Sequence, residues 1–159
     1  MGLIPFQPAQ RASGPPEYRE FDIQAGTTFT IGAPMQRNSG TPSDIEEHSG
    51  GGDSTDLIGV ALFGATSGVP AGKGSTAYGT RMIVGIAHPD QLYLGQLTNA
   101  GAVVTPAKSD MRTYGMVKVT NDWYVDQEDI GGDVILQVVT IYPNIDAVLF
   151  KFLAASISP

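Results

Sequence analysis

The apolar residues of this chain gather in short runs rather than at helical spacing. The run at 57–63, Leu-Ile-Gly-Val-Ala-Leu-Phe, is apolar on both faces and is split by Gly59, as is typical of a fully buried strand with a local bend. Residues 83–87, Ile-Val-Gly-Ile-Ala, repeat this order around Gly85. The two runs predict neighbouring strands of a small barrel whose backbones approach closely at the glycines.

Shorter strand signals continue along the chain from residue 21. Phe29 and Ile31 alternate with threonines between glycine-containing turns, which indicates a half-buried strand. No segment sustains a 3.6-residue period, so the sequence predicts an all-β fold, a small β-barrel or β-tulip-like sandwich, as a single domain over 21–159. The remaining strand signals lie at 91–94, 114–119, 123–125, 134–141 and 147–153.

The first 20 residues have a different character, with prolines at positions 5, 8, 15 and 16. Proline fixes φ and removes a donor, so we expect an extended N-terminal arm that is neither helix nor central strand. A frayed tail fits the prolines equally well, but an apolar cluster favours an arm that docks on a partner. Removal of 1–18 is then expected to abolish docking and leave the β fold intact. The residues expected to contact the partner are Leu3, Ile4, Phe6, Pro8, Arg11 and Tyr18.

Two polar, glycine-rich segments, 36–56 and 64–76, flank the first apolar run. In the first, Ser43 and Glu46 have the spacing of a capping box, so that one helical turn and a short extended segment are equally compatible with it. Both segments are expected to be loops, and whether they bind partners is open.

The composition excludes several classes of function. Nine basic against sixteen acidic residues give a net charge of −7, which argues against binding to nucleic acid or to anionic membranes. The absence of cysteine excludes disulfides and thiolate chemistry. The N-terminus lacks the features of a signal peptide, and no apolar run approaches the roughly 18 residues of a membrane helix. We therefore expect a soluble protein made in a cytoplasm.

The candidate chemical motifs are incomplete. The stretch 67–74 resembles a phosphate-binding loop, but it begins with Ser67 instead of glycine and has Gly74 after the lysine instead of Ser or Thr. The acidic stretch 126–133 does not fit an EF-hand loop, because Ile130 stands at the fifth position, where an oxygen ligand is needed, and Gln137 at the twelfth, where the closing Glu is needed. His48 and His88 have no metal-ligand partners at regular spacing, and there is no Gly-x-Ser-x-Gly motif. The sequence therefore predicts no enzyme activity, no cofactor and no metal site.

Trp123, Tyr124 and Tyr93 leave a second class of function open. Exposed aromatic rings could form a platform for stacking on a carbohydrate, whereas aromatics in strands are more often part of the core, and Trp123 beside a turn could also plug a hairpin. A ligand-binding or carbohydrate-binding β-domain is therefore an alternative.

The order of these elements resembles that of tailed-phage capsid decoration proteins, also called cement or head-stabilising proteins. The resemblance is carried by an N-terminal arm, the segment Ala25-Gly26-Thr27-x-Phe29-x-Ile31-Gly32-Ala33-Pro34, a polar glycine-rich excursion and the strand Ile58-Gly59-Val60-Ala61. It covers residues 21–153, and its motifs are short.

The resemblance implies a β-barrel or β-tulip that binds the major capsid protein on the outside of the virion and stabilises the mature shell. It also implies homotrimers and an arm that reaches across capsid subunits. Acidity on such an outer surface would be harmless. A tail or tail-fibre β-module is the alternative within the structural class.

Overall fold

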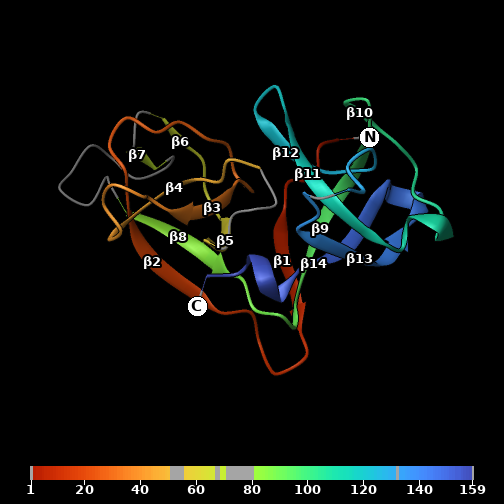
Figure 1. Ribbon diagram of the computed structural model, residues 1–159, viewed down its shortest axis with the longest axis horizontal. Helices are drawn as coiled ribbons and strands as arrows, with labels where there is room; N and C mark the ends of the chain where they lie inside the picture. The colour runs from red at the N-terminus through yellow and green to blue at the C-terminus, as the bar shows by residue number, and fades with distance from the viewer. Residues whose placement is uncertain (1, 51–55, 67–68, 71–80, 132, 159) are drawn as a thin grey trace.

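The computed structural model describes residues 2–50, 56–66, 69–70, 81–131 and 133–158. In this part of the chain the regular elements are strands and three short 3-10 helices, which confirms the predicted all-β class. The strands form two groups that lie side by side, to the left and the right in Figure 1.

The first group is a closed five-stranded barrel, as predicted. Its two glycine-split strands, β5 and β8, pair antiparallel with Val60 opposite Gly85, so the repeated apolar pattern does mark neighbouring strands. A Cβ at Gly59 would overlap the carbonyl group of Gly85, which confirms the predicted close approach of the two backbones, whereas a Cβ at Gly85 would overlap the Pro8 side chain. In barrel order, the strands are β2 (Tyr18–Ile23), β4 (Asp44–Glu47), β3 (Pro34–Arg37), β5 (Leu57–Ala61) and β8 (Arg81–Ile86).

The second group is a seven-stranded sheet that closes on itself. Its path runs from β9 through β12, β11 and β13 to β14, and β14 pairs with β9 again. We call these five strands the second ring; β1 and β10 are added to β9 outside it. The strands of this sheet are β1 (Gln7–Arg11), β9 (Gln91–Asn99), β10 (Ala102–Val103), β11 (Thr113–Val119), β12 (Asp122–Asp126), β13 (Leu136–Tyr142) and β14 (Ala147–Phe152).

The barrel and the second ring have the same connectivity. In each, the first strand pairs in parallel with the third, β2 with β4 and β9 with β12. In each, the third strand then pairs with the second, the second with the fourth, the fourth with the fifth and the fifth with the first, all antiparallel. The chain is therefore a tandem repeat of one five-stranded design.

The smaller elements connect these strands. The short pair β6 (Ala65–Thr66) and β7 (Val69–Pro70) follows β5, and the 3-10 helices are η1 (Lys108–Asp110), η2 (Pro143–Ile145) and η3 (Ala154–Ser156). After η3 the chain returns to the barrel, where Ser158 N donates to Leu57 O. The C-terminus thus lies beside the barrel rather than beside the second ring (Figure 1).

The N-terminal segment is part of the fold instead of a free arm. Residues Gln7–Arg11 form an edge strand on β9, and Phe6 is only 1% exposed within the hydrophobic core. The expected boundary at 20/21 falls inside β2. The segment lies between the barrel and the second ring (Figure 1). Removal of 1–18 would take away strand β1 and the core ring of Phe6, so the expectation that this truncation leaves the β fold intact is wrong.

Two further expectations can be compared with the structure. Residues 44–47 form strand β4, so the extended alternative, and not a helical turn, is found after Ser43. The strand signals at 114–119 and 123–125 correspond to β11 and β12, which pair antiparallel as a hairpin. Most of the candidate phosphate loop at 67–74 lies outside the described residues.

Candidate binding surfaces

The six residues predicted to contact a partner do not form one surface. Phe6 is buried, Pro8 packs on Gly85, and Ile4 is half-buried with its N–H donating to Gln96 Oε1 at 3.0 Å. Arg11 is held by two carboxylates, Asp90 and Glu17. Leu3 and Tyr18, 45% and 51% exposed, remain accessible, but they belong to different parts of the fold.

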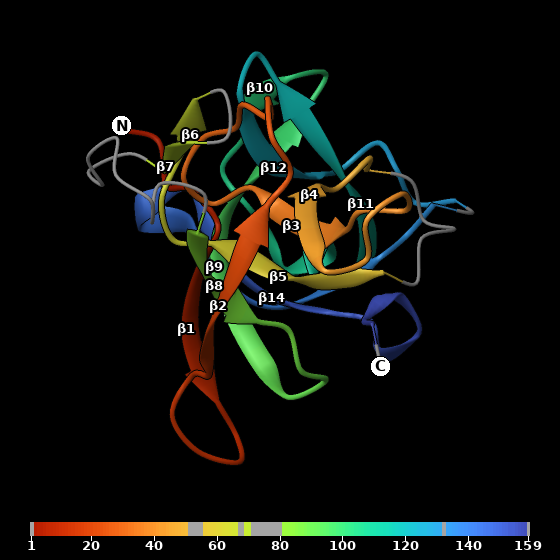
Figure 2. The same cartoon turned by 90° about the vertical axis from the view of Figure 1, so that its left-hand side faces the viewer.

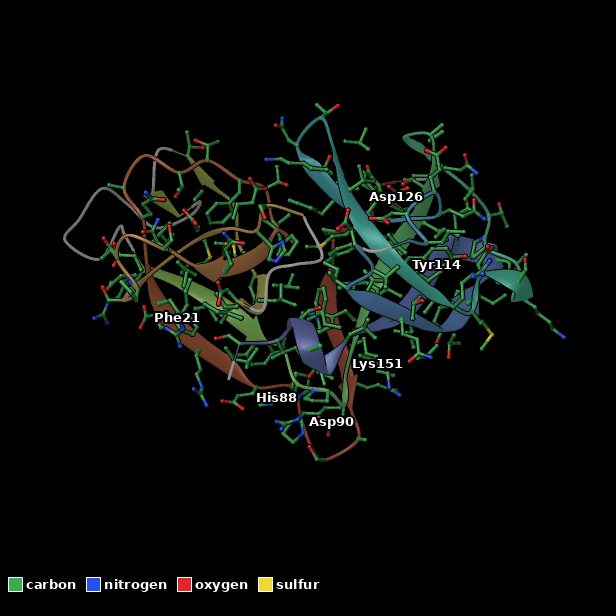
Figure 3. The ribbon with its side chains drawn as sticks, in the orientation of Figure 1. Phe21, His88, Asp90, Tyr114, Asp126 and Lys151 are labelled. Atoms are coloured by element: carbon green, nitrogen blue, oxygen red, sulfur yellow. The ribbon has the colours of Figure 1, made fainter. Side chains whose placement is uncertain are left out.

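A protruding tip is built by the loop between β1 and β2 and the turn at His88–Pro89–Asp90 (Figure 2). Asp90 accepts hydrogen bonds from Ser13 N at 2.9 Å and from Arg11 Nε at 3.3 Å, and these bonds lower the pKa of the Asp90 carboxyl. His88 and Asp90 lie close together at this end of the molecule (Figure 3). The tip is therefore a folded feature held by charged side chains.

Glu17 is the central acceptor next to the tip. Its carboxylate lies 2.7 Å from His88 Nε2, 2.6 Å from Arg19 Nε and 3.7 Å from Arg11 Nη1. The hydrogen bonds from His88 and Arg19 lower the pKa of Glu17. Glu17 thus has Arg19 and Arg11 as partners, and Arg11 has a second carboxylate partner in Asp90.

A hollow of about 460 Å³ opens at this end of the barrel. Arg19 and Arg37 line it, and Phe21 on β2, which Figure 3 labels, contributes an aromatic surface. The C-terminal segment after η3 closes one side with Ile157 and Ser158. Small-ligand and peptide sites often lie at the mouths of barrels, so this hollow is a candidate binding site. The other lining residues are Ile58, Ile86, Ala87, His88, Pro89 and Ala154.

A second hollow, of about 320 Å³, lies on the outer face of the second ring. Leu94 on β9 and Leu149 on β14 are directly opposite each other in the sheet. Their chain neighbours Tyr93 and Phe150 point inward to the core, so the two leucines point to the outer face. Tyr142 is 41% exposed at the edge of this hollow. The face is mainly apolar, and its other lining residues are Ala9, Gln10 and Ile145.

The aromatic residues considered for a carbohydrate platform do not form one. Trp123 is 5% exposed and Tyr93 is fully buried, so neither ring presents a face to a sugar. The indole Nε1 of Trp123 donates to Glu47 Oε1 at 2.7 Å, and Lys118 Nζ lies 2.7 Å from Glu47 Oε2. These residues instead connect β12 and β11 of the second ring to β4 of the barrel.

His48, next to Glu47, is also buried. Its Nδ1 accepts a hydrogen bond from Gly50 N at 2.9 Å, while its Nε2 has no hydrogen-bond partner in the described part of the chain. Burial lowers the pKa of His48 below 6.5. The imidazole is therefore neutral at pH 7 and serves as a core residue.

The acidic stretch at 126–133 has a structural role. Asp129 packs where Gly115 has no side chain, and burial, with Asp133 nearby, raises the pKa of the Asp129 carboxyl. Within the residues that the structure describes, no group of three or more His, Asp or Glu side chains is placed to hold a metal ion.

A buried carboxylate that belongs to none of the sequence motifs lies beside this stretch. Asp110 is 5% exposed and accepts hydrogen bonds from Ala107 N at 2.7 Å, Gln127 Nε2 at 2.8 Å and Tyr114 Oη at 3.2 Å. Burial and the neighbouring Asp110 raise the pKa of Tyr114 to about 12. These bonds satisfy the Asp110 oxygens internally, so Asp110 fixes the loop before β11.

Comparisons with protein-family models and with curated proteins find no match for this chain. Across the described ranges, no helix is both long and apolar enough to cross a bilayer. The two hollows are therefore the candidate contact sites for a partner, and the sequence resemblance indicates the class of partner.

Proposed function

We propose that the protein is a structural component of a virion that binds the outer surface of a phage capsid as a homotrimer and stabilises the mature shell. The proposal combines the sequence resemblance at 25–34 and 58–61 with a rigid fold that exposes an apolar face. A ligand that binds only one state of a shell stabilises that state by mass action, and a symmetric lattice repeats a modest contact many times.

The observation that carries this proposal is the apolar outer face of the second ring. Leu94 and Leu149 form its floor, and Tyr142 and Ile145, each 41% exposed, form its edge. Burial of such side chains contributes roughly 25 cal/mol per Å² of apolar surface, so a face of this kind favours contact with another protein. It replaces the N-terminal arm as the proposed contact with the capsid protein.

The first experiment is to purify virions and measure the copy number of this chain relative to the major shell protein. A constant ratio fixed by the shell lattice is expected. A few copies that co-purify with tails would instead favour a tail or tail-fibre module, and absence from virions would contradict the proposal. Light scattering of the purified protein tests the trimer separately.

The second experiment locates the contact. Tyr142→Ser together with Ile145→Ser should weaken binding to shells that lack this protein and should lower the heat resistance of the decorated shells. Ile130→Ser is the matched control, because Ile130 is 56% exposed and does not line this hollow. Equal binding by the double variant and the control would exclude this face as the contact.

A further inference from the structure

Because the barrel and the second ring share one five-stranded design, each residue of a barrel strand can be compared with the equivalent residue of the second ring. The buried parallel pairs are Ile23 with Ile45 in the barrel and Leu97 with Val125 in the second ring. Four residues before Ile23 and Leu97 stand Arg19 and Tyr93, and each is opposite a buried residue of the last strand, Val84 or Phe150. Arg19 and Tyr93 are therefore equivalent.

The second arginine of the hollow has an apolar counterpart as well. Arg37 pairs with Ile45, and Met116 pairs with Val125. In the second ring the equivalent positions are thus Tyr93 and Met116, which are 0% and 5% exposed. The five-stranded design itself does not require arginine at either place.

In the second ring, this end is covered by an extended segment of the chain. Strand β1 pairs with the first half of β9, and the ring of Phe6 packs on Phe150 with centroids 4.7 Å apart. The hydroxyl of Tyr93 donates to Gly85 O in the barrel, so the end is sealed inside the molecule. Strand β2 is the barrel's equivalent of β9. In the described part of the chain, no additional strand pairs with β2 as β1 pairs with β9, and the hollow lies at this equivalent end of the barrel.

The charge at this open end is unusual for an acidic chain. Arg37 makes one hydrogen bond, from Nη1 to Pro42 O at 3.3 Å, and forms no ion pair with the described residues. Arg19 is 63% exposed and shares Glu17 with His88 and Arg11. Two guanidinium groups therefore retain donors for an anion, on a chain whose net charge is −7.

We propose that this open end of the barrel binds an extended acidic peptide segment of a partner protein. Its carboxylates pair with Arg19 and Arg37, and an apolar side chain between them lies on Phe21. We expect the bound segment to be extended, because the equivalent end of the second ring is covered by an extended segment, β1. Arg19 is exposed, so its guanidinium can reach a carboxylate of a peptide that lies across the hollow. This site is separate from the apolar face above and does not depend on the capsid role.

The test uses the full-length protein and an array of short peptides that combine Asp or Glu with Leu, Ile or Phe. Matched peptides carry Asn or Gln in place of the acids, and the strongest peptide is then labelled for fluorescence anisotropy. We expect binding of acidic peptides only, weakening as salt is raised, because exposed charge pairs are screened. Absence of any preference for the acidic peptides would overturn the proposal.

The site is located with variants that replace each arginine of the hollow by the residue at the equivalent position of the second ring. Arg19→Tyr and Arg37→Met should each weaken binding about tenfold, as expected for loss of a charge-assisted hydrogen bond. Arg81→Met is the matched control, since Arg81 belongs to the same barrel but pairs with Glu20 and Asp22 and does not line the hollow. Unchanged binding in both hollow variants, or equal loss in the control, would contradict the assignment, and unchanged thermal unfolding verifies that the variants are folded.

Discussion

The ring of Phe6 fills the space that a side chain at Gly95 would need. A Cβ at Gly95 would lie 2.6 Å from Phe6 Cδ1, closer than such atoms approach in proteins. In the comparison of the two rings Gly95 corresponds to Phe21, because Gly95 lies two residues before Leu97 and Phe21 lies two residues before Ile23. An aromatic ring therefore occupies this position in both repeats, from its own strand in the barrel and from β1 in the second ring.

Phe6→Ala should lower the free energy of unfolding by about 3–5 kcal/mol, because it leaves a cavity among buried aromatic residues. Leu3→Ala is the control, since Leu3 is 45% exposed and a change there should cost less than about 0.5 kcal/mol. Urea unfolding followed by fluorescence measures both. Equal stability of the two variants would show that the N-terminal segment does not belong to the core.

Gly95→Ala should cost about 1–3 kcal/mol, because the added methyl group overlaps the Phe6 ring. The variant that combines Gly95→Ala with Phe6→Ala should lose less stability than the sum of the two single changes, since removal of the ring makes room for the methyl. The same unfolding measurement, arranged as a double-mutant cycle, tests this. Strict additivity would mean that the two positions are not in contact.

Trp123→Phe should destabilise the protein by about 1–3 kcal/mol, because Glu47, whose carboxylate is largely buried, loses the indole N–H that it accepts. Lys118→Met removes the other partner of Glu47 and should cost less, about 0–1 kcal/mol, because this ion pair is partly exposed. Thermal unfolding compares the two. A larger loss of stability in Lys118→Met than in Trp123→Phe would show that the ion pair to Glu47, and not the indole hydrogen bond, is the main contact between the two repeats.

Stability should fall as the pH is lowered from 7.5 to 5.5. Burial lowers the pKa of His48 in the folded protein below 6.5, so the unfolded state binds a proton first and is favoured as the pH passes below that value. The lowered carboxyl pKa values of Glu17 and Asp90 act at lower pH, below about 4.5. His48→Asn should flatten the slope between pH 7.5 and 5.5, and an unchanged slope would assign it to another group.

Local pattern was sufficient to predict the all-β class and its central strand pair. Residues 57–61 and 83–86 are continuous apolar runs, and a strand that is apolar on both faces is expected to be buried on both. The glycines at 59 and 85 likewise signalled a local bend or a close backbone approach, because these are among the features that glycine in a strand interior marks.

The site residues were harder to predict, because they depend on contacts between distant parts of the chain. The prolines around Phe6 indicate an extended segment, but whether that segment is free or paired is decided by β9, far along the sequence. The glycine inside β9 was a signal for this contact. For Trp123 the partner is Glu47, and no spacing connects the two residues.

The sequence by itself thus determined the class of fold, the positions of the main strands from residue 81 onward together with β5, and the incompleteness of the familiar catalytic and metal motifs. Only the tertiary structure decided that the five-stranded design occurs twice, that β1 seals one end and that Arg19 and Arg37 line the same hollow at the other. The physical reason is that apolar alternation is a local property set by the pleat of each strand, whereas strand register and the covering of an end depend on long-range pairing.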